Sequence, residues 1–80
     1  MRVEVRLYAT LVEHVESARA GDPLPVEIRN GAMLTELLDQ LGIAPGDVHL
    51  SIVNGRPIHD MAHELTDGDR VGLFPPTGGG

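Results

Sequence analysis

The sequence contains no cysteine, no lysine and only two aromatic residues, Tyr8 and Phe74. Without cysteine the chain has no disulfide, no thiolate zinc site and no cysteine nucleophile. With so few aromatic side chains, we expect a core of leucine, valine, isoleucine and methionine. The chain has 80 residues and a mass of 8.6 kDa. Chains of this length can fold alone, so we expect one small domain.

The charge is acidic, with a net value of −6 at pH 7, and all six basic residues are arginines. The arginines are scattered along the chain and form no basic stripe, which argues against a nucleic-acid ligand. An acidic protein suits a partner with a basic surface. No stretch approaches the ~20 apolar residues that span a bilayer, and the start lacks a signal-peptide core. We therefore expect a cytoplasmic protein with no membrane partner.

Residue periodicity predicts the order β-α-β-α-β-β-β. Strict alternation predicts a strand over 2–8 with Val3, Val5 and Leu7 on one face. Further strands are expected at 25–29, at 48–53 with His49 pointing outward, at 56–58, and around Val71. The remaining pattern predicts a short helix over 9–16, a strong amphipathic helix over 33–41 closed by Gly42, and tight turns at 54–55 and 67–69. Residues 60–65 fit either a turn or one helical turn.

One amphipathic helix laid on one small mixed sheet is the simplest way to bury both apolar surfaces. The first and last strands are both apolar on one face and fit parallel positions at the centre of the sheet. This arrangement is the α+β fold called β-grasp, or ubiquitin-like. We expect residues 1–76 to form this domain and residues 77–80 to be a flexible C-terminal tail.

The domain itself offers no convincing catalytic group. His59 and His63 have metal-ligand spacing but lack a third ligand, so we interpret them as surface histidines and predict no metal site. Ser17 and Ser51 have no nucleophile motif around them. The two aspartates of 67–69 flank a glycine, and turn chemistry explains them. We therefore expect a protein that is not itself an enzyme.

The informative feature is the run Gly78-Gly79-Gly80, which follows Phe74-Pro75-Pro76 and Thr77. Two prolines stiffen the exit from the last strand and direct the tail outward. Glycines without side chains can thread a narrow channel and bring a terminal carboxylate into another protein. The alternative is a frayed end of the chain without a function.

At this point the sequence resembles a known family. The segment Leu65-Thr66-Asp67-Gly68-Asp69-Arg70-Val71-Gly72-Leu73-Phe74-Pro75-Pro76, followed by Gly79-Gly80, resembles the end of the ubiquitin-like sulfur carriers of the MoaD/ThiS family. The opening Val5-Arg6-Leu7-Tyr8-Ala9 is similar to the first strand of the branch that forms the small subunit of molybdopterin synthase.

The resemblance implies a carrier that binds no cofactor tightly. A ubiquitin-activating-like adenylyltransferase would use ATP to adenylate the carboxylate of Gly80. A sulfur donor of the cysteine desulfurase or rhodanese type would convert Gly80 to a thiocarboxylate. Thr77, Gly78 and Gly79 would carry that sulfur into a large synthase subunit for the biosynthesis of the molybdenum or tungsten cofactor. Without cysteine or lysine, the chain has no internal thiol or ε-amine to intercept its activated end.

Strand parity indicates where such partners would dock. Since Leu7 and Leu73 point inward, Tyr8 and Phe74 are expected on the opposite face of neighbouring strands, both exposed. Exposed aromatic residues beside a functional tail are typical of an interface hot spot. We therefore expect Tyr8, Phe74, Pro75 and Pro76 to form the partner interface.

Other functions remain open at this stage. The sulfur could serve thiazole synthesis, tRNA thiolation or cysteine synthesis. An activated Gly80 could instead be joined to a lysine of another protein, as a ubiquitin-like modifier is. The chain could also be an interaction module whose tail is never activated.

Overall fold

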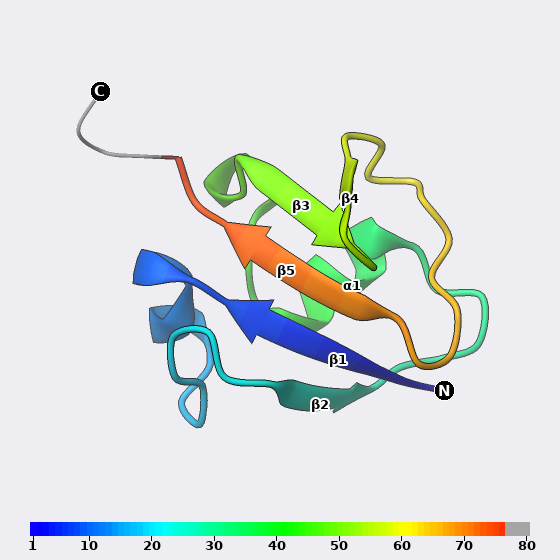
Figure 1. The fold of residues 1–80 in the computed structure, drawn as a ribbon, viewed down its shortest axis with the longest axis horizontal. Helices are drawn as coiled ribbons and strands as arrows, with labels where there is room; N and C mark the ends of the chain where they lie inside the picture. The colour runs from blue at the N-terminus through cyan, green and yellow to red at the C-terminus, as the bar shows by residue number, and fades with distance from the viewer. Residues whose placement is uncertain (77–80) are drawn as a thin grey trace.

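Five strands form one mixed sheet in the order β2-β1-β5-β3-β4, in a computed structural model that describes residues 1–76 (Figure 1). The expected tail over 77–80 lies outside the described residues. The chain runs through β1 (Arg2–Leu7), η1 (Ala9–His14), β2 (Leu24–Glu27), α1 (Leu34–Leu41), η2 (Pro45–Asp47), β3 (Leu50–Val53), β4 (Arg56–Ile58) and β5 (Arg70–Phe74).

The centre of the sheet confirms the β-grasp prediction. β1 and β5 are parallel, with Val5 opposite Val71 and Leu7 opposite Leu73, while the other pairs are antiparallel. α1 covers one face of this sheet (Figure 1). The layer between them is aliphatic, as the composition predicts, and its buried residues are Val3, Val5, Leu7, Leu11, Val26, Ile28, Ala32, Leu34, Leu37, Leu38, Ile43, Val53, Leu65, Val71 and Leu73.

The main helix forms where the apolar stripe predicts it. Leu34, Leu37 and Leu38 are fully buried against the sheet. Gly42 ends the helix in the left-handed conformation, with φ of 75°. A residue without a Cβ adopts this conformation at little cost, so glycine is favoured there.

The first predicted helix is wrong in type and in length. Instead of a helix over 9–16, the chain forms a six-residue 3-10 helix, η1, of which only Leu11 is buried. Val15 already has extended backbone angles, with φ of −130° and ψ of 116°. The β-branched Val12 and Val15 lower the helix propensity of this segment, so a short, tight connection replaces the helix.

The strand predicted at 48–53 begins later and faces the other way. In β3, Ser51 and Val53 are buried, whereas Leu50 and Ile52 are half-buried on the face away from α1. The register explains this, because Ser51 lies opposite Leu73, and directly paired residues point to the same side of a sheet. The exposed His49 precedes the strand, and its N–H donates to the carbonyl of Phe74 at 2.8 Å.

Both edges of the sheet contain a proline within the strand, Pro25 in β2 and Pro57 in β4.

Residues 60–65, for which the sequence allowed either a turn or one helical turn, form a loop. Its Glu64 makes an isolated bridge with Met33. The carbonyls of Met61 and His63 accept bonds from the first N–H groups of α1. Among residues 1–76, no helix is long and apolar enough to cross a membrane.

Candidate functional site

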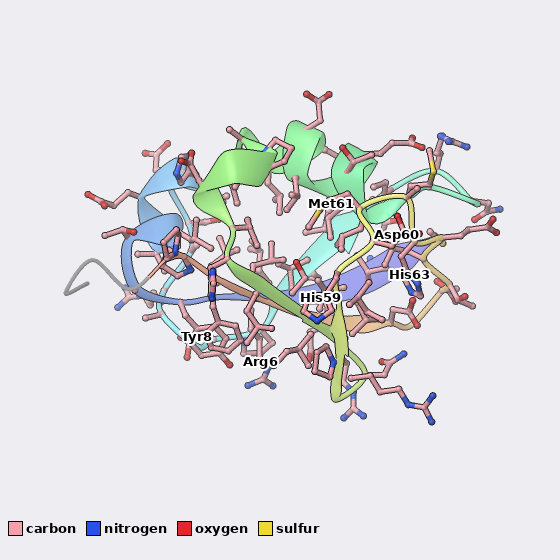
Figure 2. All side chains as sticks on the ribbon, turned by 90° about the horizontal axis from the view of Figure 1, so that it is seen from above. Arg6, Tyr8, His59, Asp60, Met61 and His63 are labelled. Atoms are coloured by element: carbon pink, nitrogen blue, oxygen red, sulfur yellow. The ribbon has the colours of Figure 1, made fainter. Side chains whose placement is uncertain are left out.

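The candidate site is the face of the sheet that α1 leaves uncovered, called here the outward face. Figure 2 shows Arg6 and Tyr8 projecting from this side of the sheet. The rings of Tyr8 and Phe74 stack on it, with centroids 4.3 Å apart and planes 5° from parallel. Strand parity places both residues here because Leu7 and Leu73, their chain neighbours, are buried in the core.

The expectation that both aromatic residues are exposed is wrong in degree. Tyr8 and Phe74 are half-buried, and no large apolar side chain is fully exposed in the described part of the chain. Each ring covers one face of the other, which removes apolar area from water. The outer edges of the stack remain the accessible apolar surface. The role of this surface in binding a partner stays a prediction.

Two aliphatic residues of β3 extend the stack into a larger patch. Leu50 lies opposite Phe74, and Ile52 lies opposite Gly72 in the middle of the face. A Cβ at Gly72 would lie 3.6 Å from Cε1 of Phe74 and 3.7 Å from Cε2 of Tyr8, so the rings lean over this glycine. We call these five residues the aromatic patch.

Leu50 and Ile52 were missed as site residues. Alternation points the fully apolar face of Val48, Leu50 and Ile52 into the core and the face with His49 and Ser51 outward, which is the reverse of what the structure has. The signal that could have found them is register. β3 pairs with β5, and the inward position of Leu73 then turns Ser51 inward and its two neighbours outward.

After β5 the chain leaves the sheet directly beside the aromatic patch. The N–H of Tyr8 donates to the carbonyl of Leu73 at 3.2 Å, and the carbonyl of Phe74 accepts from His49. Beyond these bonds Pro75 is half-buried and Pro76 exposed. The chain thus departs at the end of the sheet where β1 leads into η1 (Figure 1). Four predicted site residues lie outside the described residues: Thr77, Gly78, Gly79 and Gly80.

The Asp-Gly-Asp turn anchors the other end of β5. Asp69 is buried, and its carboxylate accepts from Nδ2 of Asn54 and from the N–H of Thr66, both at 2.8 Å. Oδ1 of Asp67 accepts from the N–H of Arg2 at 2.8 Å. Asn54 itself has φ of 52°, and its Oδ1 accepts from the N–H of Arg70 at 2.9 Å. These aspartates therefore tie β5 to both neighbouring strands, beyond the turn that the sequence predicts.

The polar candidates that the sequence analysis set aside do not gather into a site. Figure 2 shows His59, Asp60 and His63 in the loop that follows β4. Within residues 1–76, no three histidine, aspartate or glutamate side chains are close enough to share a metal ion. Ser51 is buried in the core, and its hydroxyl has no hydrogen-bond partner among residues 1–76. Ser17 is exposed.

Solved structures with this fold come from archaea and bacteria. The HVO 2177 protein of Haloferax volcanii is 30% identical, with a TM-score of 0.76, over 100% of this chain and 87% of that one. A chain of the complex of subunits 1 and 2 of the molybdopterin-converting factor from Helicobacter pylori 26695 is 26% identical, with a TM-score of 0.64 and full coverage of both chains. SAMP1 of Haloferax volcanii, at 24% identity, a TM-score of 0.71 and full coverage of both, shows the fold alone.

The family comparison covers nearly the whole chain. No curated protein matches the sequence. The model of the ThiS family matches residues 5–80, from the middle of β1 through Pro75-Pro76 to the last glycine. The match therefore includes the aromatic patch, the anchored turn before β5 and the glycine run, and the chain belongs to the ThiS family.

Proposed function

We propose that the chain is a ubiquitin-like sulfur carrier whose Gly80 carboxylate becomes a thiocarboxylate and donates its sulfur in molybdopterin biosynthesis. The observation that carries this proposal is the path of β5. The strand passes through the aromatic patch and ends at Phe74, and Pro75-Pro76 follow it, with Pro76 four residues before Gly80. A partner that binds the patch therefore holds the start of the tail, and the glycines beyond it can reach a buried active site.

The first chemical step makes the carboxylate reactive. A carboxylate is a poor electrophile because its charge is delocalised and its oxygens are poor leaving groups. An oxygen of Gly80 attacks the α-phosphorus of ATP, the bond to the β-phosphate breaks, and pyrophosphate leaves. The resulting acyl-adenylate carries AMP as a good leaving group. A ubiquitin-activating-like adenylyltransferase supplies the donors that stabilise the developing charge.

The second step installs sulfur. The terminal sulfur of a persulfide on a partner cysteine attacks the acyl carbon of Gly80 and displaces AMP. A second thiol of the donor system then cleaves the sulfur–sulfur bond. This releases the Gly80 thiocarboxylate and leaves a disulfide on the donor. A cysteine desulfurase or rhodanese-type protein would supply the persulfide.

A large synthase subunit would receive the sulfur. The complex of subunits 1 and 2 from Helicobacter pylori gives a precedent for a two-subunit assembly built on this fold. In such an assembly the carrier contributes docking and reach, while the large subunit contributes the active site. The aromatic patch is the surface we assign to this contact, because aromatic residues dominate the binding energy of protein interfaces.

Intact-mass spectrometry tests the proposal directly. The chain is incubated with ATP, the adenylyltransferase from the same genome and a persulfide donor. We expect a mass gain equal to the replacement of one oxygen by one sulfur. The matched control is the chain without Gly80, which should fold normally and stay unmodified. Thiocarboxylate formation on the shortened chain would contradict the assignment of the reactive group.

The same experiment separates the alternatives. Adducts of the chain on lysines of other proteins would favour a protein modifier. An unchanged mass would favour an interaction module whose tail is not activated. If the thiocarboxylate forms, adding the large subunit and a pterin precursor tests the pathway. Persistence of the thiocarboxylate would then direct the search to thiazole, tRNA or cysteine synthesis.

A further inference from the structure

Arginines gather on the outward face of this acidic protein. In β1, Arg2 and Arg6 point outward, and in β5 Arg70 does so. Of the 12 acidic residues in the chain, two lie at the outward-facing positions of β1, β2 and β5, namely Glu4 and Glu27. On these strands three arginines thus stand against two glutamates, and the exposed Asp67 lines the same hollow as Arg2 and Arg70, whereas the chain as a whole has a net charge of −6.

The three arginines differ in what they contact. Nη2 of Arg2 lies 2.7 Å from Oε1 of Glu27, and Nε of Arg6 lies 3.4 Å from Oε2 of Glu4. Arg70 is exposed, and its side chain makes no hydrogen bond or ion pair with any residue among 1–76. Its guanidinium therefore retains its full capacity to bind a carboxylate.

Arg70 also lies where two hollows meet. One hollow, of about 170 Å³, lies beside the aromatic patch and is lined by Arg6, Tyr8, Ile52, Gly55, Arg70, Val71, Gly72 and Phe74. The other, of about 560 Å³, lies toward the start of β1 and is lined by Arg2, Val3, Glu4, Pro23, Pro25, Asp67, Gly68 and Arg70. Of the lining residues in the described part of the chain, Arg70 is the one that both hollows share. An apolar contact and a charged contact are thus adjacent along β5.

We infer that the outward face binds an acidic, extended segment of a partner protein. An apolar side chain of that segment occupies the hollow over Gly72, and a neighbouring carboxylate pairs with the guanidinium of Arg70. The planar guanidinium can bind both carboxylate oxygens at once, which gives geometric as well as electrostatic selection. The inference rests on the proposed carrier function for the identity of one partner, the adenylyltransferase.

The first test measures adenylation kinetics with Arg70→Gln. Its matched control is Arg56→Gln, which removes the same charge from an exposed side chain. Arg56 lies opposite the inward Val53 and lines a different hollow with His63 and Glu64. We expect Arg70→Gln to raise the KM for the carrier about tenfold at unchanged kcat and to weaken its salt dependence. Equal KM values for the two variants would overturn the inference.

The second test does not depend on activation. The labelled chain is titrated with a short capped peptide that alternates glutamate with leucine, and amide shifts are followed by NMR. We expect shifts at Gly55, Arg70 and Gly72, an affinity about tenfold lower for Arg70→Gln, and none of these shifts with a peptide that alternates lysine with leucine. No shifts, or equal binding of both peptides, would overturn the inference. Peptide binding by a chain that is never thiocarboxylated would contradict the proposed function alone.

Discussion

The ring of Tyr8 lies parallel to the ring of Phe74, with their centroids 4.3 Å apart. Tyr8 directly follows β1, and Phe74 is the last residue of β5, so the stack joins the ends of the two central strands. The pair thus has two roles at one place. It holds the point where the chain leaves the sheet, and it supplies apolar surface beside that point.

Phe74→Ala should weaken binding to the adenylyltransferase by about 1–3 kcal/mol, because it removes the centre of the aromatic patch. It should also lower the free energy of unfolding by about 1 kcal/mol, because the stacked pair is lost. Isothermal titration calorimetry and urea unfolding measure the two effects. Leu41→Ala is the control, since Leu41 is half-buried on α1, on the far side of the sheet. It should reduce stability and leave binding unchanged. Equal affinity of Phe74→Ala and the parent would contradict the docking role.

Asp69→Ala should destabilise the fold by about 2–3 kcal/mol, because it removes the buried carboxylate that accepts two part-buried hydrogen bonds, from Nδ2 of Asn54 and from the N–H of Thr66. Asp67→Ala should cost only about 1 kcal/mol, since it removes one exposed bond to the N–H of Arg2. Urea unfolding at constant m-value compares the two variants. A smaller loss for Asp69→Ala than for Asp67→Ala would show that the buried network does not hold the start of β5.

Ser51→Ala should raise the free energy of unfolding by up to about 1 kcal/mol. The hydroxyl of Ser51 is buried without a hydrogen-bond partner in the described part of the chain, and its removal relieves a desolvation cost. The control is Ser17→Ala at an exposed position, which should change stability little. A loss of stability in Ser51→Ala would mean that the hydroxyl has a bonding partner in solution.

The stability of the fold should fall in acid partly through Glu36. Arg29 donates to both carboxylate oxygens of Glu36, and this hydrogen bonding lowers the pKa of Glu36 below its usual value. The unfolded chain therefore binds a proton at a higher pH than the folded chain does. The stabilising contribution is complete above the usual glutamate pKa and is lost as pH falls through the lowered one.

Urea unfolding between about pH 6 and about pH 3 checks this sign. Arg29→Gln should make the loss of stability in acid less steep, because it removes the charged hydrogen-bond donor that is the main cause of the lowered pKa of Glu36. Arg19→Gln removes an equal charge at an exposed position and should leave the loss of stability in acid as it is in the parent. A steeper loss of stability in acid for Arg29→Gln would contradict the assignment.

Much of the fold was predictable because its strongest patterns are local. The alternation of Val3, Val5 and Leu7 predicts one buried face of β1, and all three are buried. The apolar stripe of residues 33–41 predicts one buried face of the helix, and α1 forms there and ends at Gly42. The parallel pairing of β1 with β5 followed from matching apolar faces. The 3-10 helix η1 was not predictable in this way, since its apolar spacing fits an α-helix equally well.

The candidate site was only partly predictable, because it depends on register. Parity with their chain neighbours predicts Tyr8 and Phe74 on the outward face. Their mutual stacking and partial burial depend on the distance between the ends of β1 and β5, which the sequence does not give. Ile52 belongs to the patch because it lies opposite Gly72, and this pairing cannot be read from the sequence. The gathering of three arginines on this face could not be read from the sequence either, since Arg2, Arg6 and Arg70 come together only where β1 and β5 run side by side.

The prolines at the two edges of the sheet have a consequence for the protein at high concentration. Pro25 and Pro57 lack the N–H that a further strand would need, and each lies within its edge strand. Edge-to-edge assembly, which leads to strand-exchanged dimers and fibrils, is therefore disfavoured on both sides. Both edges of the sheet are thus poor surfaces for polymerisation even when the protein is concentrated, and contacts with other molecules are left to the outward face.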